Sequence, residues 1–398
     1  MMRISLPALP RGLPPLDTES STHLQATQAV LAERVRAAQD GFLPFDEWMD
    51  IALYQPGIGY YAAGNAKFAS DDQPVADFTT APELTPVFGR VVARQVHQIL
   101  GACHSISVLE FGAGSGALAE SLIGALRDLG VEPAYQILEV SGELRQRQQQ
   151  RLRHLDADIQ WLDRLPLQFE GCVVANEVLD AMPVKLFRWS DSGELLELGV
   201  TWVDDEDGMG FQLTGRAAPD SLVQIVRTRV PFMPGYQSEI NLRAEAWVGE
   251  MGQWLKKGAA LLVDYGFPRH EYYHPQRAEG TLMCHFRHHA HGEPLVLPGL
   301  QDITAHVDFT AMADAAVAAD LDVLGYTSQG RFLMNAGLAQ AINNLDPGDT
   351  IAYARAVAAV QRLMSEAEMG ELFKVLAVGR NIDVELVGFS HGDRRHRL

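Results

Sequence analysis

The sequence contains few cysteines and few basic residues. Only Cys103, Cys172 and Cys284 occur among 398 residues. Three cysteines cannot form a disulfide framework, and their wide spacing excludes a CxxC zinc site, so we expect a reducing compartment. The 51 acidic residues outnumber the 32 Lys and Arg, which gives a formal net charge of -19 at pH 7. A chain this acidic is a poor candidate for non-specific binding to nucleic acid or to an anionic membrane.

Long apolar runs and targeting signals are also missing. No apolar stretch approaches the ~18 residues that a membrane span requires. The proline-rich N-terminal segment has no apolar signal-peptide core, and its early acids and scarce arginines do not suit a transit peptide. We therefore expect a cytoplasmic protein of bacterial type, with no membrane insertion and no nucleic-acid partner.

The composition is that of a globular protein. Hydrophobic residues make up 47% of the chain, which is enough for a core and excludes disorder throughout. Expected strands and helices alternate from residue 107 to residue 183, and further strands are expected at 258–267, 321–329 and 373–380. This alternation predicts an α/β fold with parallel βαβ units in a doubly wound sheet.

These patterns predict a core that is interrupted by insertions. The predicted parts are a flexible N-terminal arm (1–20), a cap of helices and loops (21–103), the α/β core (104–270 and 307–385) with a β insertion at about 184–235, an inserted loop segment (268–306), and a tail (386–398). The tail is basic, and we expect it to be frayed.

A glycine-rich turn between an expected strand and helix is the first candidate site. Residues 110–117 read EFGAGSGA. Glycines at such a turn let a ligand approach the backbone, and the helix start offers free N–H groups. Gly112, Gly114 and Ala117 fit the dinucleotide fingerprint G-x-G-x-x-G/A. The motif alone therefore leaves three possibilities open: a nicotinamide enzyme, an S-adenosylmethionine enzyme, or a tight turn without a ligand.

Acidic residues at the expected strand ends discriminate between these possibilities. Glu110 precedes the first glycine by two residues, where a carboxylate suits a ligand with a positive ammonium and sulfonium better than a pyrophosphate. Glu139 ends the next strand and can accept hydrogen bonds from ribose hydroxyls. Asp163 follows the third strand and can accept from an adenine amine. The alternatives are a solvated strand end for Glu139 and a surface turn for Asp163.

A second polar set follows the fourth expected strand. It consists of Asn176, Glu177 and Asp180. Ligands of open α/β sheets bind beyond the carboxyl ends of the strands, so this set points to the place of a methyl acceptor. Two carboxylates three residues apart can share a helical face and hold a guanidinium. Helix capping, with Asn176 as the N-cap, is the alternative and is compatible with that role.

Seven segments, in order, match the motifs of a known family. They are YQPGIGYY (54–61), DFTTAPELTPVFG (77–89), VLEFGAGSG (108–116), LEVS (138–141), NEVLDAMPV (176–184), LVDYG (262–266) and QDITAHVDF (301–309). In these segments the chain resembles the MidA-type S-adenosylmethionine-dependent methyltransferases, whose mitochondrial members are respiratory complex I assembly factors. The resemblance extends from about residue 42 to about residue 380.

The resemblance implies a fold, a cofactor and a reaction. The fold is a Rossmann-like class I methyltransferase with a seven-stranded, mostly parallel sheet, an N-terminal helical cap and insertions. The cofactor is S-adenosylmethionine. The reaction is methylation of a protein arginine side chain, which in mitochondria lies on a core subunit of complex I. Another methyl acceptor, or a client-binding assembly chaperone that retains the cofactor site, remains an alternative, and a nicotinamide dehydrogenase is a more distant one.

The resemblance also implies roles for particular residues around the cofactor. Gly112, Gly114 and Gly116 would pass under the methionine part, with Glu110 near the amino group and Glu139 on the ribose. The segment from Asp77 to Glu83, including Thr79 and Pro82, would close over the cofactor.

Three positions depart from the family pattern. Ala76 stands where the family often has glycine, and Ala113 and Ser115 replace a proline and an arginine of the mitochondrial members.

Glu177 and Asp180 match acids of the family's turn after the fourth strand. Their assignment to an arginine substrate is an analogy with the double-acid loops of other arginine methyltransferases.

Two further residue groups invite a functional interpretation. The histidine-rich segment 284–291 lacks a partner pair of ligands, and the chain contains no H-E-x-x-H motif, so we expect no metal site. His306 is a candidate general base, although a hydrogen-bonded structural histidine would fit the pattern equally well. Tyr54, Tyr60 and Tyr61 would pack beside the cofactor or an arginine, or belong to the core.

Overall fold

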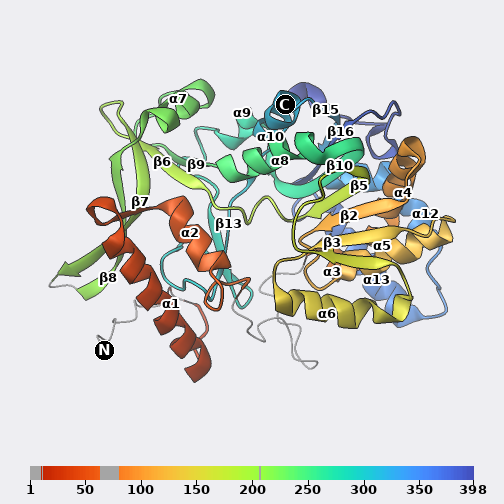
Figure 1. Cartoon of the computed structure of the whole chain (residues 1–398), viewed down its shortest axis with the longest axis horizontal. Helices are drawn as coiled ribbons and strands as arrows, with labels where there is room; N and C mark the ends of the chain where they lie inside the picture. The colour runs from red at the N-terminus through yellow and green to blue at the C-terminus, as the bar shows by residue number, and fades with distance from the viewer. Residues whose placement is uncertain (1–9, 11, 63–79, 206–207) are drawn as a thin grey trace. The chain divides into compact units, whose positions relative to one another are not determined.

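The computed structural model describes residue 10 and residues 12–62, 80–205 and 208–398 (Figure 1). The chain divides into two compact units. The first unit comprises Met1–Phe78, Asp180–Arg243 and His270–His306, and the second comprises Thr79–Leu179, Ala244–Arg269 and Val307–Leu398. The finer partition into arm, cap, core and insertions stays a prediction.

The second unit is built on an eight-stranded sheet. The strand order is β15-β16-β10-β5-β2-β3-β4, and β14 pairs with β10. The strands are β2 (Ser107–Phe111), β3 (Ala134–Leu138), β4 (Ile159–Leu162), β5 (Phe169–Asn176), β10 (Leu255–Phe267), β14 (Val307–Asp308), β15 (Asp322–Ser328) and β16 (Phe373–Arg380). All pairs from β10 to β4 are parallel, whereas β16 is antiparallel to both of its neighbours. The predicted Rossmann-like class I fold is confirmed, and the short β14 adds an eighth strand to the seven that were predicted.

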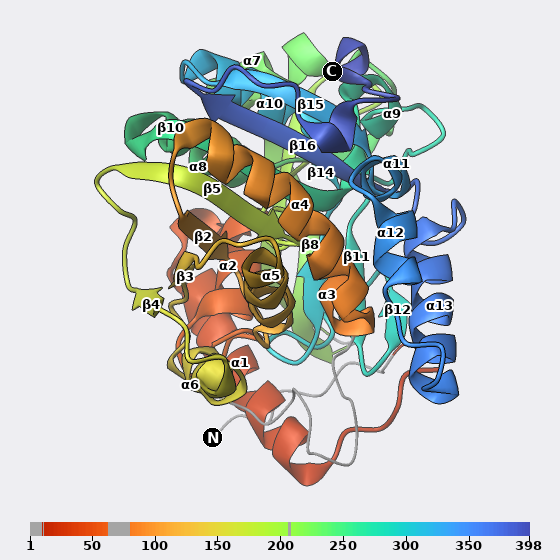
Figure 2. The ribbon, with the colours of Figure 1, turned by 90° about the vertical axis from the view of Figure 1, so that its right-hand side faces the viewer.

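Helices cover both faces of this sheet. The helices of the second unit are α3 (Ala81–Leu84), α4 (Pro86–Cys103), α5 (Ala117–Asp128), α6 (Gly142–Leu152), α10 (Phe309–Ala318), α11 (Gln329–Asn335), α12 (Leu338–Asn343) and α13 (Thr350–Met364), with nearly all of α8 (Leu242–Trp254). Figure 2 shows α4 and α5 across one face. They share a core cluster with Val108 and Val174, while Trp247 and Trp254 of α8 pack against Phe111. Side chains alternate along a strand, so Val108 and Phe111 point to opposite faces.

The central strands explain why the sheet needs two helical layers. In β10, residues 259–263 are all buried. A near-continuous apolar run of this kind is typical of a parallel strand that is covered on both faces. The parallel connections run through helices, with α5 between β2 and β3 and α6 between β3 and β4. The turns that precede α5 and α6 therefore lie at the carboxyl edge of the sheet.

The C-terminal tail lies along the edge strand β15. Arg394 donates its backbone N–H to the Tyr326 carbonyl at 2.6 Å, and Thr327 donates its hydroxyl to the Gly392 carbonyl at 2.8 Å. Arg395 also donates to the carbonyl of Val323 at 3.0 Å. The expectation of a frayed tail is therefore wrong, because two of these three hydrogen bonds use backbone carbonyls that an edge strand leaves free.

The first unit contains two smaller sheets. One has the order β1-β7-β6-β9 with β8 paired to β7, and the other has the order β12-β11-β13. Its strands are β1 (Phe42–Pro44), β6 (Lys185–Trp189), β7 (Leu195–Asp205), β8 (Gly208–Ala217), β9 (Gln237–Ile240), β11 (Met283–Phe286), β12 (His289–His291) and β13 (Asp302–Thr304). The β7–β8 hairpin lies within residues 184–235, where the β insertion is predicted.

The helices of the first unit are α1 (Thr18–Ala37), α2 (Phe45–Tyr54) and α7 (Asp220–Arg229), and α9 (Arg269–Tyr272) joins the two units along the chain. Helix α1 begins at Thr18, within the segment 1–20 that the sequence predicted as a flexible arm. Its N-cap is Asp17, whose carboxylate accepts from the Ser20 N–H at 2.7 Å. Helix α7 was not expected, because the sequence there indicated only strands.

Candidate active site

The glycine turn follows β2 and adopts a backbone that favours glycine. Gly112, Gly114 and Gly116 have φ angles of 62°, 52° and 86°. Glycine enters this left-handed region without steric cost. A Cβ on Gly112 would lie 2.9 Å from Val178 Cγ2, whereas a Cβ on Gly114 would meet no atom within 4 Å. The protein leaves open space beside Gly114, which is the space that a ligand would need.

Glu110 is a buried carboxyl group directly before this turn. Its side chain is 2% exposed, and its Oε2 accepts from the Tyr135 hydroxyl at 2.7 Å. Burial raises the pKa of Glu110 to about 7, and the nearby Glu139 charge adds to the rise, while the Tyr135 hydrogen bond opposes it. A positively charged ligand group near Glu110 would therefore gain a carboxylate partner shielded from water.

Glu139 follows β3 and is held by two hydrogen bonds. Its Oε1 accepts from the Ser141 N–H at 2.9 Å, and its Oε2 accepts from Gln148 Nε2 at 3.0 Å. The pKa of Glu139 is raised, because burial outweighs these hydrogen bonds. Each oxygen keeps further acceptor capacity, so the carboxylate can still accept from two ribose hydroxyls.

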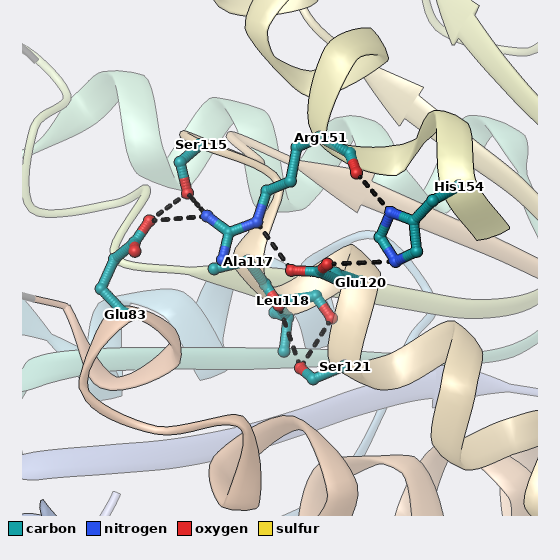
Figure 3. Close-up of polar contacts among 8 residues, drawn as sticks. All are labelled: Glu83, Ser115, Ala117, Leu118, Glu120, Ser121, Arg151 and His154. Carbon is teal, nitrogen blue, oxygen red and sulfur yellow. Dashed lines mark hydrogen bonds and ion pairs between the residues drawn. The ribbon is translucent and has the colours of Figure 1, made fainter. Parts of the chain in front are cut away.

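The remaining predicted cofactor residues lie in different parts of the structure, and not all of them lie near the glycine turn. Asp163 is 84% exposed in its side chain and forms an ion pair with Arg145 at 2.5 Å. Pro82 and Glu83 lie in α3, and Glu83 accepts from the Ser115 hydroxyl in the glycine turn (Figure 3). Asp77 and Thr79 lie outside the described residues. The structure thus brings Glu83 to the glycine turn, and all these cofactor contacts stay predictions.

The turn after β5 holds Asn176 and Glu177. Asn176 ends the strand, and its Nδ2 donates to Glu177 Oε1 at 2.9 Å. Glu177 has a φ of 54° although it is not a glycine, and its N–H donates to the Val263 carbonyl at 2.8 Å. A side chain in the left-handed region costs free energy, and such residues cluster at functional sites.

No helix follows this turn before β6, which begins at Lys185, in a segment that the structure describes throughout. Glu177 and Asp180 therefore do not share a helical face, and Asn176 is not an N-cap, so both of these expectations are wrong. The physical reason is the left-handed backbone at Glu177, which a right-handed helix cannot contain. The proposed chemistry of the acids does not depend on a helix.

Asp264 contributes to the same turn and was missed by the sequence reasoning. It is 1% exposed, and its Oδ2 accepts from the Leu179 N–H at 3.0 Å. The signal was present in the sequence, because Asp264 is a charged residue near the end of an apolar strand. A buried carboxylate needs hydrogen-bond partners, and the nearby turn supplies one.

Asp180 and His306 belong to the first unit. Asp180 is 1% exposed, and its carbonyl accepts from the Ala305 N–H at 3.0 Å, next to His306 in the chain. The His306 N–H donates to the Thr281 hydroxyl at 3.0 Å. Within the first unit, the structure therefore brings the Asp180 and His306 segments together, and the catalytic roles of both residues stay predictions.

The three tyrosines form a ring cluster in the first unit. Tyr54 and Tyr61 stack with centroids 5.5 Å apart, and Tyr60 meets Tyr61 edge-on. The Tyr61 hydroxyl donates to Asp302 at 2.8 Å, and that of Tyr54 donates to the Ala181 carbonyl at 2.8 Å. Burial and the Asp302 charge raise the pKa of both Tyr54 and Tyr61, so these tyrosines stay neutral.

The described part of the chain holds neither a metal-binding cluster nor a membrane-spanning helix. Within residues 12–62, 80–205 and 208–398, no group of three or more His, Cys, Asp or Glu residues could hold a metal ion. Among the helices of these same residues, none is long and apolar enough to cross a membrane.

Comparisons with known proteins bear directly on the cofactor. Residues 88–327 match the model of a family described as S-adenosyl-L-methionine-dependent methyltransferases. A Burkholderia thailandensis protein crystallised with S-adenosyl-homocysteine is 47% identical, with a TM-score of 0.91 over 97% of this chain and 100% of that one. A second crystal structure from Burkholderia thailandensis is 46% identical, with a TM-score of 0.88 over the same shares.

Curated relatives are more distant. A Drosophila melanogaster protein named protein arginine methyltransferase NDUFAF7 homolog, mitochondrial, is 26% identical over 93% of this chain and 89% of its own length. The Homo sapiens protein arginine methyltransferase NDUFAF7, mitochondrial, is 25% identical over 83% and 79%.

The glycine turn with its open side, and the buried acids Glu110 and Glu139, fit the charged and hydroxyl groups of S-adenosylmethionine. The family match and the bound S-adenosyl-homocysteine of the similar structure agree with this fit. The chain therefore belongs to the S-adenosyl-L-methionine-dependent methyltransferase family, of the MidA type, and S-adenosylmethionine is its cofactor.

Proposed function

We propose that this methyltransferase modifies an arginine side chain of a protein. The observation that carries the proposal is Glu177, a carboxylate held in a left-handed backbone at the carboxyl end of β5. Arginine is recognised by carboxylates through paired, charge-assisted hydrogen bonds. The names of the curated relatives support the same acceptor, and the sequence resemblance to the MidA-type family suggests a subunit of complex I as one candidate partner.

The chain's own residues have two tasks in this reaction. When bound, the cofactor supplies a methyl group on a sulfonium, which is a good leaving group. A free guanidinium is protonated and is a poor nucleophile. Glu177 would orient the guanidinium and keep its positive charge on the nitrogens that do not react. One proton must leave the methylated nitrogen, and a carboxylate beside it can accept that proton.

The turn is built to hold Glu177 in place. The Val263 carbonyl accepts from the Glu177 N–H, and Asp264 accepts from the Leu179 N–H two residues later. These two contacts fix the backbone on both sides of Val178. Positioning of this kind contributes to catalysis because reacting groups must meet in a narrow range of geometry. Asp180 and His306 enter the proposal through the sequence resemblance alone.

The test is transfer of labelled methyl groups. Purified full-length protein is incubated with labelled S-adenosylmethionine and an extract of cells that lack it, and labelled proteins are hydrolysed to amino acids. We expect methylarginine, and we expect Glu177→Gln to lower its formation by about 100-fold or more while S-adenosyl-homocysteine affinity is unchanged. Glu170→Gln is the matched control, because Glu170 is an exposed residue at the other end of β5.

Two outcomes would contradict the proposal. Label on another residue type would leave a methyltransferase with a different acceptor. Cofactor binding without any labelled protein would favour a client-binding assembly chaperone instead.

A further inference from the structure

Helix α6 carries a glutamine with an unusual environment. Most of this helix is polar, and only Gln148 and Leu152 are buried. The Gln148 side chain is 0% exposed. Fully buried glutamines are uncommon, and their polar atoms need hydrogen-bond partners. The partners of Gln148 therefore indicate what this residue does.

The Gln148 amide contacts the glycine turn after β2, Glu139 after β3 and Trp161 on β4, and these three parallel strands are neighbours in the sheet. Its Nε2 donates to the Gly114 carbonyl at 3.0 Å and to Glu139 Oε2 at 3.0 Å. Its Oε1 accepts from Trp161 Nε1, on β4, at 2.9 Å. An indole nitrogen only donates, so the amide can have only one orientation. A single side chain thus ties the glycine turn to Glu139.

We propose that Gln148 is a positioning residue for the cofactor, which acts by holding the Glu139 carboxylate and the Gly114 carbonyl in one arrangement. Ser141 holds Oε1 of Glu139 and Gln148 holds Oε2, so rotation of the carboxylate breaks a hydrogen bond on each oxygen. A carboxylate that is already oriented loses less freedom when the ribose binds. The inference rests on the predicted ribose role of Glu139 and is independent of the methyl acceptor.

Arg151 lies one turn later on α6 and provides the contrast (Figure 3). It donates to the Ser115 hydroxyl at 2.7 Å and to Glu120 at 2.8 Å, and Glu83 lies 3.7 Å away. Its side chain is 34% exposed, and exposed ion pairs contribute little. Arg151 therefore contacts the same glycine turn as Gln148, but it does so through the Ser115 side chain. None of these Arg151 contacts involves Glu139.

The experiment is a calorimetric titration of full-length protein with S-adenosyl-homocysteine. Gln148→Met keeps the size and removes the amide, and we expect the Kd to rise about tenfold. In a Glu139→Ala background, the same change should raise the Kd less than twofold, because its effect passes through Glu139. Arg151→Met is the matched control, with a rise below threefold that persists in the Glu139→Ala background.

The dependence of the Gln148→Met effect on Glu139 separates positioning from general destabilisation. A general loss of stability would weaken binding both with Glu139 and in the Glu139→Ala background. An unchanged Kd for Gln148→Met would overturn the proposal, and so would an equal rise with and without Glu139. If Gln148→Met does not fold, Trp161→Phe replaces it, because it frees the amide oxygen and lets the amide turn. That variant should raise the Kd about twofold only when Glu139 is present, and a Kd that does not change would overturn the proposal in the same way.

Discussion

The turns after β2 and β5 lie at the same edge of the sheet, but they reach a left-handed backbone in different ways. In the β2 turn, each residue with positive φ is a glycine. In the β5 turn, the residue with positive φ is Glu177. The first turn has no side chains where we expect the cofactor to approach. The second keeps a carboxylate in spite of its conformational cost, which supports the proposed role of Glu177.

The largest expected effect tests the open side of the β2 turn. Gly114→Val should abolish binding of S-adenosyl-homocysteine, measured by calorimetry, because a branched side chain would occupy the ligand's space. Gly130→Val is the matched control, since Gly130 also has positive φ, at 84°, and open space around its Cβ. Both variants carry a similar backbone cost, so only a ligand clash can make them differ. Retained affinity in Gly114→Val would move the cofactor away from this turn.

The next effect concerns the ribose. Glu139→Ala should weaken S-adenosyl-homocysteine binding by about 1–3 kcal/mol, because hydrogen bonds to a carboxylate are lost. Glu143→Ala serves as the control, because the Glu143 carboxylate pairs with Arg147 within the neighbouring helix α6. Equal dissociation constants for Glu139→Ala and the unmodified protein would place the ribose elsewhere.

The third effect is a pH dependence of cofactor binding. The pKa of Glu110 is about 7 in the free protein, and a bound ammonium would lower it. Binding near neutral pH should then release a proton, and affinity should fall by up to about tenfold per pH unit as the pH drops below 7. Calorimetry in buffers of different ionisation enthalpy measures that proton. The raised Glu139 pKa adds to the same trend. Glu110→Gln should therefore reduce the slope of log affinity against pH. An unaltered slope would exclude Glu110 as a group that titrates on binding.

The raised pKa of Glu110 acts in the opposite direction on the stability of the free protein: cofactor affinity should rise with pH, whereas stability should fall. The folded state binds the proton more tightly than the unfolded chain, whose carboxyl has a pKa of about 4.5. The contribution of Glu110 to stability is therefore fully present below pH 4.5 and is lost as the pH rises through 7.

The smallest expected effect is on stability at the β5 turn. Glu177→Gly should raise Tm by about 2 °C, because glycine removes roughly 1 kcal/mol of left-handed backbone cost. Glu177→Gln keeps the backbone cost and should leave Tm unchanged, while both variants should lose methyl transfer. A Tm that falls in Glu177→Gly would show that the carboxylate supports the fold and is not held there at a cost.

These two turns also show what the sequence can reveal. The β2 turn was predictable because glycine marks positive φ in the sequence and the flanking apolar runs mark a strand and a helix. The β5 turn was predicted as a helix start, since nothing in the residue types of Asn176 and Glu177 signals a left-handed glutamate. That conformation depends on the Val263 carbonyl, which lies 86 positions away in the chain and adjacent in the sheet.

Inward-facing polar residues were harder to find. Helix α6 is so polar that its sequence predicts an exposed helix. Nothing in residue type distinguishes the buried Gln148 from Gln149 and Gln150, which follow it and are exposed. The basic tail was misjudged for a related reason. Its hydrogen bonds to Tyr326 and Val323 depend on tertiary contacts with an edge strand, which composition does not encode.

The position of that tail has a consequence for how the protein is made. Residues 392–395 are synthesised after every strand of the large sheet, yet they provide the partners on the outer side of β15. On the ribosome, that side of β15 stays open until the tail has emerged, and an open strand edge can pair with another chain. Premature termination of translation before residue 392 would thus release a molecule that has every strand of the large sheet but leaves the outer side of β15 free to pair with another chain and aggregate.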